Sequence, residues 1–288
     1  MKIKITADST CDIPAELQKE KGISIIPLEV ILGAEVIQDT GWELTQKIYA
    51  YEKATGKLPK TAARSSEVYG EFFAEQLESC DAIVHYSISH KCSASLQEAA
   101  RAALKFDGKV FVIDGYALST GTALLAFYGC DLRDKGLDAK TIYEESLKRV
   151  KHAQTSFIID RLDYLYKGGR CSRLALFGAN LLKIKPTIVM RDGALEPGKK
   201  FRGPTARVVE SYVDYIMDTF NKPDLKRCFI THTEIDPEIV NAVRLQVAER
   251  YRFEEVIETV AGAVITSHCG KGTLGVLYIN DGGGNVSE

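Results

Sequence analysis

The sequence predicts an α/β protein of two domains, an N-terminal α/β/α domain on a parallel sheet and a C-terminal α+β domain with a mixed sheet. Short β-rich runs alternate with amphipathic stretches through residue 150, which is typical of parallel strands joined by crossover helices. This pattern changes near residue 156, and the later Asp192-Gly193 pair favours a β-hairpin. We therefore expect domains over residues 1–155 and 156–288, with a ligand slot between them.

The first half alternates predicted strands and helices. Apolar β-rich runs predict strands over residues 2–7, 23–32, 82–86 and 109–114. Pro27 interrupts the second run, so we expect an edge strand or a bent crossing there, and Gly33 then opens a small hairpin. The spacing of apolar residues predicts helices over residues 42–53, 67–77, 96–103, 118–132 and 141–150.

The second half mixes its elements differently. After a new start at residues 156–160, predicted strands cover residues 186–191, 228–233, 253–260 and 274–280. Predicted helices cover residues 162–170, 172–182, 204–219 and 237–251. Ser172 and Pro204 suit the first positions of their helices. The absence of a regular strand–helix alternation is the reason for expecting a mixed sheet here.

Composition argues against several classes of function. With 37 basic and 39 acidic residues the net charge is -2, which does not favour binding to nucleic acid or to anionic membranes. Seven cysteines without a CxxC motif or a secretory signal favour reduced thiols in a cytoplasmic protein. No zinc-type spacing and no apolar run of about 20 residues occurs, so we expect neither a metal site nor an integral membrane segment.

Four polar turns carry the candidate chemistry, at residues 61–66, 87–95, 167–172 and 267–272. The second turn lies between a predicted strand and a predicted helix, where free N–H groups and the helix dipole attract an anion. Each turn also has a structural interpretation, such as Ser93 as a helix N-cap or Gly168 in a helix C-cap. No GxSxG or P-loop motif is present. Together the turns predict an anion pocket between the domains and no catalytic triad.

Other polar residues are interpreted structurally. Asp8, Asp12 and Asp114 lie near predicted strand ends, where caps and turns account for them. The four histidines outside the last polar turn are also assigned structural roles. They are His85, His90, His152 and His232.

A set of short segments runs in one order from residue 7 to about residue 275. They are ADSTCD at 7–12, SIS at 87–89, SAS at 93–95, VID at 112–114, Ser119 with Gly121, YLYKGGR at 164–170, KP at 185–186, KFRG at 200–203 and SHCGKG at 267–272. In this combination the chain resembles the DegV fatty-acid-binding family. The resemblance covers nearly the whole chain, and the KGGR, KFRG and HCGKG segments together are its most specific part.

The resemblance implies a long-chain fatty acid, such as palmitate, buried between two domains. It also implies a role as the acyl-carrying subunit of a bacterial fatty acid kinase, in which a separate ATP-binding partner phosphorylates the presented carboxylate. Such a chain is not itself a catalyst, it serves phospholipid metabolism, and it needs no cofactor beyond the bound lipid. Burial of the acyl tail contributes about 0.8 kcal/mol per CH₂ group.

The resemblance also implies which residues bind the fatty acid. Thr61 and Ser93 match hydroxyls that bind the carboxylate, and the N–H of Ala94 matches that of a family glycine. His268 matches a histidine near the head group, whereas Arg170 and Arg202 match basic residues at or near it. The expected fatty-acid-binding set is Thr61, Ser93, Ala94, Ser119, Arg170, Arg202 and His268.

The chain departs from the usual family pattern at a few positions. Ala62, Ala63 and Arg64 replace a serine, an amide and a proline, and Ala94 replaces a glycine. The family's Asp-Ser is Asp114-Gly115 here. An exposed Arg64, together with Lys199, Lys200 and Arg202, is a candidate basic rim for partner contact or an ordinary solvated surface.

Two other functions stay open at this point. One is a stand-alone enzyme acting on a small acidic or phosphorylated substrate, with His268 as the general base and Arg170 and Arg202 holding the anion. The other is a regulatory protein whose lipid state controls its contact with a partner.

Overall fold

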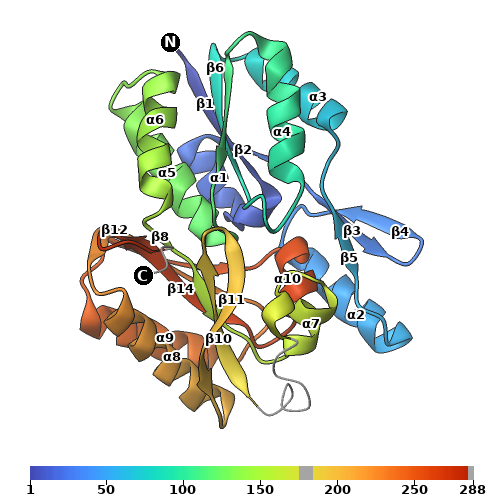
Figure 1. Ribbon diagram of the computed structural model, residues 1–288, viewed down its shortest axis with the longest axis vertical. Helices are drawn as coiled ribbons and strands as arrows, with labels where there is room; N and C mark the ends of the chain where they lie inside the picture. Colours follow the sequence, from blue (N-terminus) through green and yellow to red (C-terminus); the bar gives the residue numbers. More distant parts are fainter. Residues whose placement is uncertain (175–183, 285–288) are drawn as a thin grey trace.

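The computed structural model describes residues 1–174 and 184–284 (Figure 1). Its strands are β1 (Ile3–Asp8), β2 (Ile23–Ile26), β3 (Glu29–Leu32), β4 (Glu35–Gln38), β5 (Lys60–Ala62), β6 (Ala82–Ser87), β7 (Val110–Asp114), β8 (Ala153–Gln154), β9 (Ser156–Ile158), β10 (Lys185–Arg191), β11 (Ala194–Phe201), β12 (Pro223–His232), β13 (Glu255–Val260) and β14 (Leu274–Asn280). Its α-helices are α1 (Ala15–Lys21), α2 (Thr45–Thr55), α3 (Ser66–Leu77), α4 (Ser95–Ala103), α5 (Thr120–Asp134), α6 (Ala139–Val150), α7 (Leu162–Lys167), α8 (Thr205–Thr219), α9 (Pro237–Arg250) and α10 (Ala263–Cys269). Short 3₁₀ helices include η1 (Ser9–Cys11), η2 (Trp42–Leu44) and η3 (Leu104–Phe106).

The first sheet is parallel and has the strand order β2-β1-β6-β7. All six residues of β6 are buried, as expected for a central strand with helices on both faces. Helices α5 and α6 pack on one face and α3 and α4 on the other (Figure 1). The predicted N-terminal α/β/α arrangement is confirmed.

The second sheet is mixed and has seven strands, in the order β11-β10-β9-β14-β12-β13 with β8 paired to β14. In the described part of the chain, β12 and β13 run parallel, and the other strand pairs of this sheet are antiparallel. Helices α8 and α9 cover one face, and α5 of the first layer contacts the other. The predicted mixed sheet is confirmed. The predicted domain boundary after residue 155 falls between β8 and β9, two strands of this same sheet.

A small third sheet, β4-β3-β5, projects from the first half of the chain (Figure 1). Pro27 separates β2 from β3, so the predicted bent crossing sends residues 23–32 into two different sheets. The sheet and α2 pack against α10, which belongs to the second half, through a shared apolar cluster that includes Val30, Ile48 and Val264. Distant segments of the chain therefore meet at α10.

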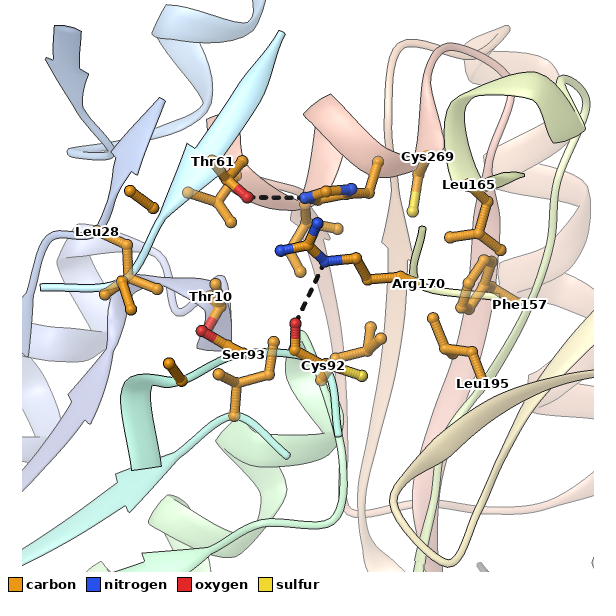
Figure 2. Close-up of a pocket in the computed structure, with 18 residues that line it drawn as sticks. Thr10, Leu28, Thr61, Cys92, Ser93, Phe157, Leu165, Arg170, Leu195 and Cys269 are labelled. Atoms are coloured by element: carbon orange, nitrogen blue, oxygen red, sulfur yellow. Dashed lines mark hydrogen bonds between the residues drawn. The ribbon is translucent and has the colours of Figure 1, made fainter. Parts of the chain in front are cut away.

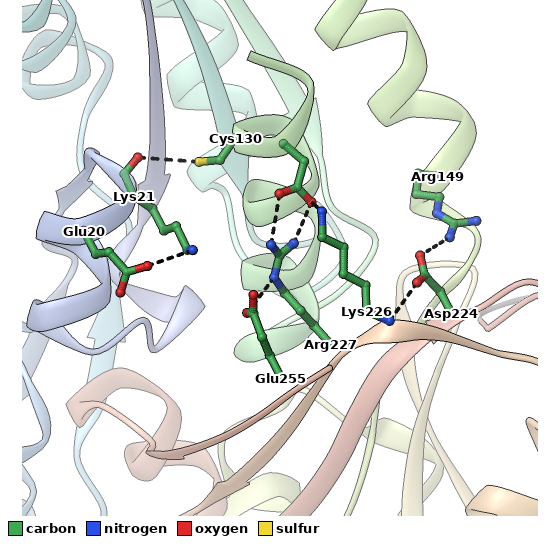
Figure 3. Close-up of polar contacts among 9 residues, drawn as sticks. Glu20, Lys21, Cys130, Arg149, Asp224, Lys226, Arg227 and Glu255 are labelled. Carbon is green, nitrogen blue, oxygen red and sulfur yellow. Dashed lines mark hydrogen bonds and ion pairs between the residues drawn. The ribbon is translucent and has the colours of Figure 1, made fainter. Parts of the chain in front are cut away.

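A buried ion-pair network also joins the two halves (Figure 3). Arg227 on β12 is 8% exposed and donates two hydrogen bonds to Asp131 on α5, at 2.6 and 2.9 Å. Its Nε donates to Glu255 on β13 at 2.9 Å, and its guanidinium lies 5.4 Å from the Phe127 ring centroid. This network fixes α5 against the second sheet.

The hairpin predicted at Asp192-Gly193 is confirmed between β10 and β11. Both residues have positive φ, 48° and 80°, as a tight two-residue turn requires. The predicted helix over 172–182 lies largely in residues 175–183, outside the described residues.

Three local expectations were wrong. Thr61 lies on a strand, β5, which pairs with β3, and does not lie in a turn. Ser267 and His268 lie on a helix, α10, which the sequence did not predict. The spacing of Leu96, Ala99, Ala100 and Ala103 predicts one shared apolar face on α4, but Ala100 is exposed and the buried residues of the helix are Ser95, Ala99 and Ala102.

Asp12 does not cap α1, because Pro14 occupies the N-cap position of that helix, but it is the C-cap residue of η1, in line with the expected role in caps and turns. The carboxylate of Asp12 is buried and accepts hydrogen bonds from the Ser119 hydroxyl and from the N–H of Gly262, at the start of α10. Asp8 is fully buried as well, and it accepts from Tyr69 and Ser87 rather than closing a turn. Both carboxylates therefore have roles in the interior of the protein.

Among the described residues, no helix combines the length and the apolar character that a membrane crossing requires. All seven cysteines carry free thiols. Within residues 1–174 and 184–284, no group of three histidine, cysteine, aspartate or glutamate side chains is placed to hold a metal ion.

Candidate functional site

A cavity of about 170 Å³ lies between the first and second halves of the chain (Figure 2). Apolar side chains from both halves form most of its wall. These are Leu28, Ala62, Ala63, Ile88, Leu118, Phe157, Leu165, Leu195, Val264 and Ile265. Two thiols, Cys92 and Cys269, also line it, and burial raises the pKa of both, which keeps them protonated.

The polar groups of the cavity come from five separate segments. Thr10 lies on η1, Thr61 on β5, Ser93 precedes α4, Arg170 follows α7 and His268 lies on α10. We call Thr61, Ser93, Arg170 and His268 the polar end of the cavity. In Figure 2 the Arg170 guanidinium is drawn between Thr61 and Ser93, while Phe157, Leu165 and Leu195 lie on the apolar side.

The side chain of His268 is held by direct contacts. Its Nε2 lies 2.8 Å from Oγ1 of Thr61, a hydrogen bond that joins α10 to β5. A Cβ on Gly168 would lie only 2.6 Å from His268 Nδ1 and 2.8 Å from the Tyr164 carbonyl oxygen, so the lack of a side chain at Gly168 lets the imidazole approach the end of α7. The imidazole therefore has one defined place at the polar end.

Burial and the positive charge of Arg170 lower the pKa of His268 to about 3. The imidazole is therefore neutral at neutral pH. A base with so low a pKa accepts protons poorly at neutral pH, which argues against a general base at this position.

Arg170 supplies the positive charge of the polar end. Its Nε donates to the Cys92 carbonyl at 3.3 Å and its Nη1 donates to the Gly168 carbonyl at 2.7 Å. An arginine has five N–H donors, so a carboxylate can still be bound. The two carbonyl contacts hold the guanidinium in place before any ligand arrives.

Ser93 precedes α4 without being its N-cap residue, a position that Ala94 occupies. The Ser93 hydroxyl accepts a hydrogen bond from the N–H of Ser95 at 3.2 Å and lies 2.9 Å from Ser95 Oγ. Ala94 has φ -77° and ψ -3°, a conformation open to any L-residue. The replacement of a family glycine by alanine therefore introduces no backbone strain.

Two members of the expected set do not line this cavity. Ser119 lies beside a separate cavity of about 30 Å³, and its hydroxyl donates to Asp12. Arg202 is exposed just after β11. The other five members, Thr61, Ser93, Ala94, Arg170 and His268, all line the main cavity.

Arg64 does not contribute to an exposed basic rim, so that expectation was wrong. Its side chain is 14% exposed and pairs with Glu29 on β3. Lys199 and Lys200 are exposed on β11, and the ammonium of Lys199 lies 4.8 Å from the Tyr215 ring centroid. Arg64 therefore secures the segment after β5 to the small sheet.

Sequence reasoning missed Thr10. Its side chain is fully buried, it lines the cavity, and its hydroxyl has no hydrogen-bond partner in the part of the chain that the structure describes. The ADSTCD segment contained Thr10, but nothing local distinguished it from its polar neighbours.

Two buried carboxylates hold the helix that carries His268. Asp12 accepts from the N–H of Gly262 at 2.8 Å, and Asp39 accepts from the N–H of Ala263 at 2.7 Å. These side-chain oxygens satisfy N–H groups at the start of α10 that have no partner within the helix. Burial raises the pKa of Asp12 to about 8 and also raises the pKa of Asp39. The first half of the chain thereby positions α10.

This site has the features of a binding site. Hydroxyls, a neutral imidazole and one guanidinium converge at the end of an apolar cavity, an arrangement that suits an anion with a long apolar tail.

Comparison with known proteins places the chain in a family. A family model described as "Uncharacterised protein, DegV family" matches residues 2–281. The fatty acid-binding protein of Thermotoga maritima is 28% identical over 283 residues, which are 96% of each chain. A fatty-acid-binding DegV family protein of Thermus thermophilus has a TM-score of 0.87 at 27% identity, over 97% of this chain and 100% of its own. The Fatty Acid Kinase (Fak) B3 protein of Streptococcus pneumoniae, loaded with linoleic acid, shares the fold with a TM-score of 0.82 at 22% identity, over 98% of this chain and 100% of its own. The chain therefore belongs to the DegV family.

Proposed function

We propose that this protein binds a long-chain fatty acid in the cavity, with the carboxylate at the polar end and the acyl chain along the apolar wall. The observation that carries the proposal is the single cavity in which Thr61, Ser93, Arg170 and His268 meet an otherwise apolar lining. Membership of the DegV family supports the proposal, because related proteins from Thermotoga maritima and Thermus thermophilus are described as fatty-acid-binding proteins.

The energetics favour such a ligand. Each buried CH₂ group contributes about 0.8 kcal/mol, so a tail of a dozen or more carbons supplies most of the affinity. Hydrogen bonds must offset the free-energy cost of removing the carboxylate from water, and charge-assisted hydrogen bonds are the strongest kind. Arg170 provides the charge, Thr61 and Ser93 provide hydroxyls, and the Ala94 N–H lies at the start of α4.

The second role we propose is presentation of the carboxylate to a separate ATP-binding kinase subunit, in the cytoplasm. The likeness in fold to the Fak B3 protein supports this role. Hydrogen-bond donors bind a carboxylate without reacting with it, so the carboxylate stays available for phosphoryl transfer by a partner. A low pKa at His268 argues against independent acid–base catalysis by this chain.

Lipid extraction tests the binding proposal directly. The purified protein is expected to release a long-chain fatty acid into organic solvent, seen by mass spectrometry, and the delipidated protein to bind palmitate. Protein that carries no acyl ligand and takes up no palmitate would contradict the proposal.

The head-group assignment needs variants. Thr61→Val removes one hydroxyl at nearly constant volume and is expected to weaken palmitate binding about tenfold, the effect of losing about 1.4 kcal/mol. Thr55→Val on the exposed end of α2 is the matched control and should leave affinity unchanged. Equal affinities for wild type and Thr61→Val would place the carboxylate elsewhere.

Acyl-phosphate formation tests the carrier role. Palmitate-loaded protein incubated with ATP and Mg²⁺ alone is expected to form no acyl phosphate, as measured by trapping with hydroxylamine. Product formed without any second protein would show that the chain is itself an enzyme. Partner affinity that depends on lipid occupancy would instead favour the regulatory alternative.

A further inference from the structure

Thr10 differs from every other polar residue of its turn. Ser9 donates to Asp39 at 3.0 Å and accepts from the N–H of Leu28 at 3.1 Å. Asp12 is bound to Ser119 and Gly262. Thr10 is 0% exposed and lies against the cavity, yet its hydroxyl has no hydrogen-bond partner among the residues that the structure describes. Buried hydroxyls are nearly always paired, so this one calls for an explanation.

The other hydroxyls at the cavity already have partners within the protein. Thr61 is hydrogen-bonded to His268, and Ser93 is hydrogen-bonded to Ser95. Thr10 lines the same cavity as Thr61 and Ser93 (Figure 2). Among the described residues the Thr10 hydroxyl, in contrast, has no hydrogen-bond partner, and it lines the cavity that contains the polar end.

The turn that carries Thr10 is rigidly placed. Asp12 and the Ser9–Asp39 pair tie η1 to the first residues of α10, the helix that presents His268. These connected hydrogen bonds therefore position both η1, which carries Thr10, and α10, which carries His268. A group fixed in this way can meet a ligand without the entropy loss of ordering a flexible side chain.

We propose that Thr10 donates a hydrogen bond to the carboxylate of the bound lipid, as a third hydroxyl beside Thr61 and Ser93. The inference rests on the proposed fatty-acid binding. A carboxylate has about four lone-pair sites, so it can accept from all three hydroxyls and from Arg170. The lipid head group also supplies the hydrogen-bond partner that the buried Thr10 hydroxyl lacks among the described residues.

Two substitutions separate the hydroxyl from the methyl group of this side chain. Thr10→Val keeps the shape and removes the donor, whereas Thr10→Ser keeps the donor and removes the methyl group. Affinities of delipidated wild type and variants are measured by calorimetry for palmitate and for 1-hexadecanol, which has the same chain without a carboxylate.

Wild type is expected to bind palmitate more tightly than 1-hexadecanol. Thr10→Val should weaken palmitate binding by five- to thirtyfold and change 1-hexadecanol binding less than twofold, while Thr10→Ser stays within threefold of wild type for palmitate. If Thr10→Val does not fold, Thr10→Ala compared with Thr10→Ser tests the same donor.

Two results would overturn the assignment of Thr10. The first is that the variant without the hydroxyl, Thr10→Val or Thr10→Ala, binds palmitate within twofold of the wild-type affinity. The second is that this variant loses as much affinity for 1-hexadecanol as for palmitate, which would show that Thr10 only packs against the acyl chain. Failure of wild type itself to bind palmitate is a different outcome, and it would refute the proposed function.

Discussion

Replacement of Arg227 by methionine tests whether the network between α5 and the second sheet stabilises the protein. Methionine keeps much of the apolar stem that packs beside Phe127 and removes the guanidinium. Three hydrogen bonds are lost, two to Asp131 and one to Glu255 (Figure 3). The change therefore leaves a partly buried carboxylate without its main partner.

The expected loss follows from the contacts of Asp131. Burial would raise the pKa of this carboxyl, but hydrogen bonds from Arg227 and Lys226 outweigh burial and hold the pKa below its ordinary value. Removing one partner of a buried ion pair costs about 3–5 kcal/mol. Lys226 still lies 2.8 Å from Asp131, which is 17% exposed, so part of the compensation remains. We expect Arg227→Met to lower the free energy of unfolding by about 2–3 kcal/mol.

Urea unfolding followed by circular dichroism measures the effect, and the melting temperature should fall by about 3–5 °C for a chain of this size. Arg244→Met is the matched control. Arg244 pairs with Glu258 at an exposed position, its side chain being 44% exposed, and its loss should cost less than about 0.5 kcal/mol.

A double variant isolates the charge effect. Adding Asp131→Asn to Arg227→Met removes the unpaired carboxylate and should recover part of the lost stability. The reasoning is refuted if the two changes add without coupling, or if Arg227→Met and Arg244→Met destabilise the protein equally.

Three further outcomes test the site. Because the pKa of His268 is about 3, its imidazole resonance in NMR spectra of the delipidated protein should not titrate between pH 5 and 8, and bound palmitate should raise that pKa. A resonance that titrates near pH 6.5 before lipid is added would contradict this. Because the pKa of Asp12 is raised to about 8, the stability of wild type relative to Asp12→Asn should decline as the pH rises from 5 to 8.5, and a constant difference in urea midpoint would contradict the buried proton. Gly168→Ala places a Cβ 2.6 Å from His268 Nδ1 and should weaken palmitate binding at least tenfold, whereas the control Gly70→Ala on α3, with open space around it, should not change it. Equal palmitate affinities of the two variants would show that the imidazole has room to move.

Local sequence patterns predicted most elements of the fold. The last strand, β14, lies at residues 274–280 as expected, and the Asp192-Gly193 hairpin is present. Alternation of strands and helices predicted the parallel sheet, and its loss after residue 156 predicted the mixed one. These features depend on period and turn chemistry, which neighbouring residues determine.

Elements held by remote contacts were missed. Helix α10 has seven residues, several of them β-branched, and a segment so short is unstable in isolation. Asp12 and Asp39 accept from its first N–H groups, although they lie more than two hundred residues away in sequence. Strand β5 has three residues and exists because β3 pairs with it. No local signal predicts either element.

The sequence by itself determined the fold class and, through its resemblance to the DegV family, the expected ligand and a set of residues to bind it. Only the tertiary structure decided that Thr61, Ser93, Arg170 and His268 share one cavity, and that Ser119 and Arg202 do not line it. It also added Thr10, whose buried hydroxyl finds no hydrogen-bond partner within residues 1–174 and 184–284. The physical reason is that burial, hydrogen-bond partners and pKa depend on side chains from distant segments, which only folding brings together.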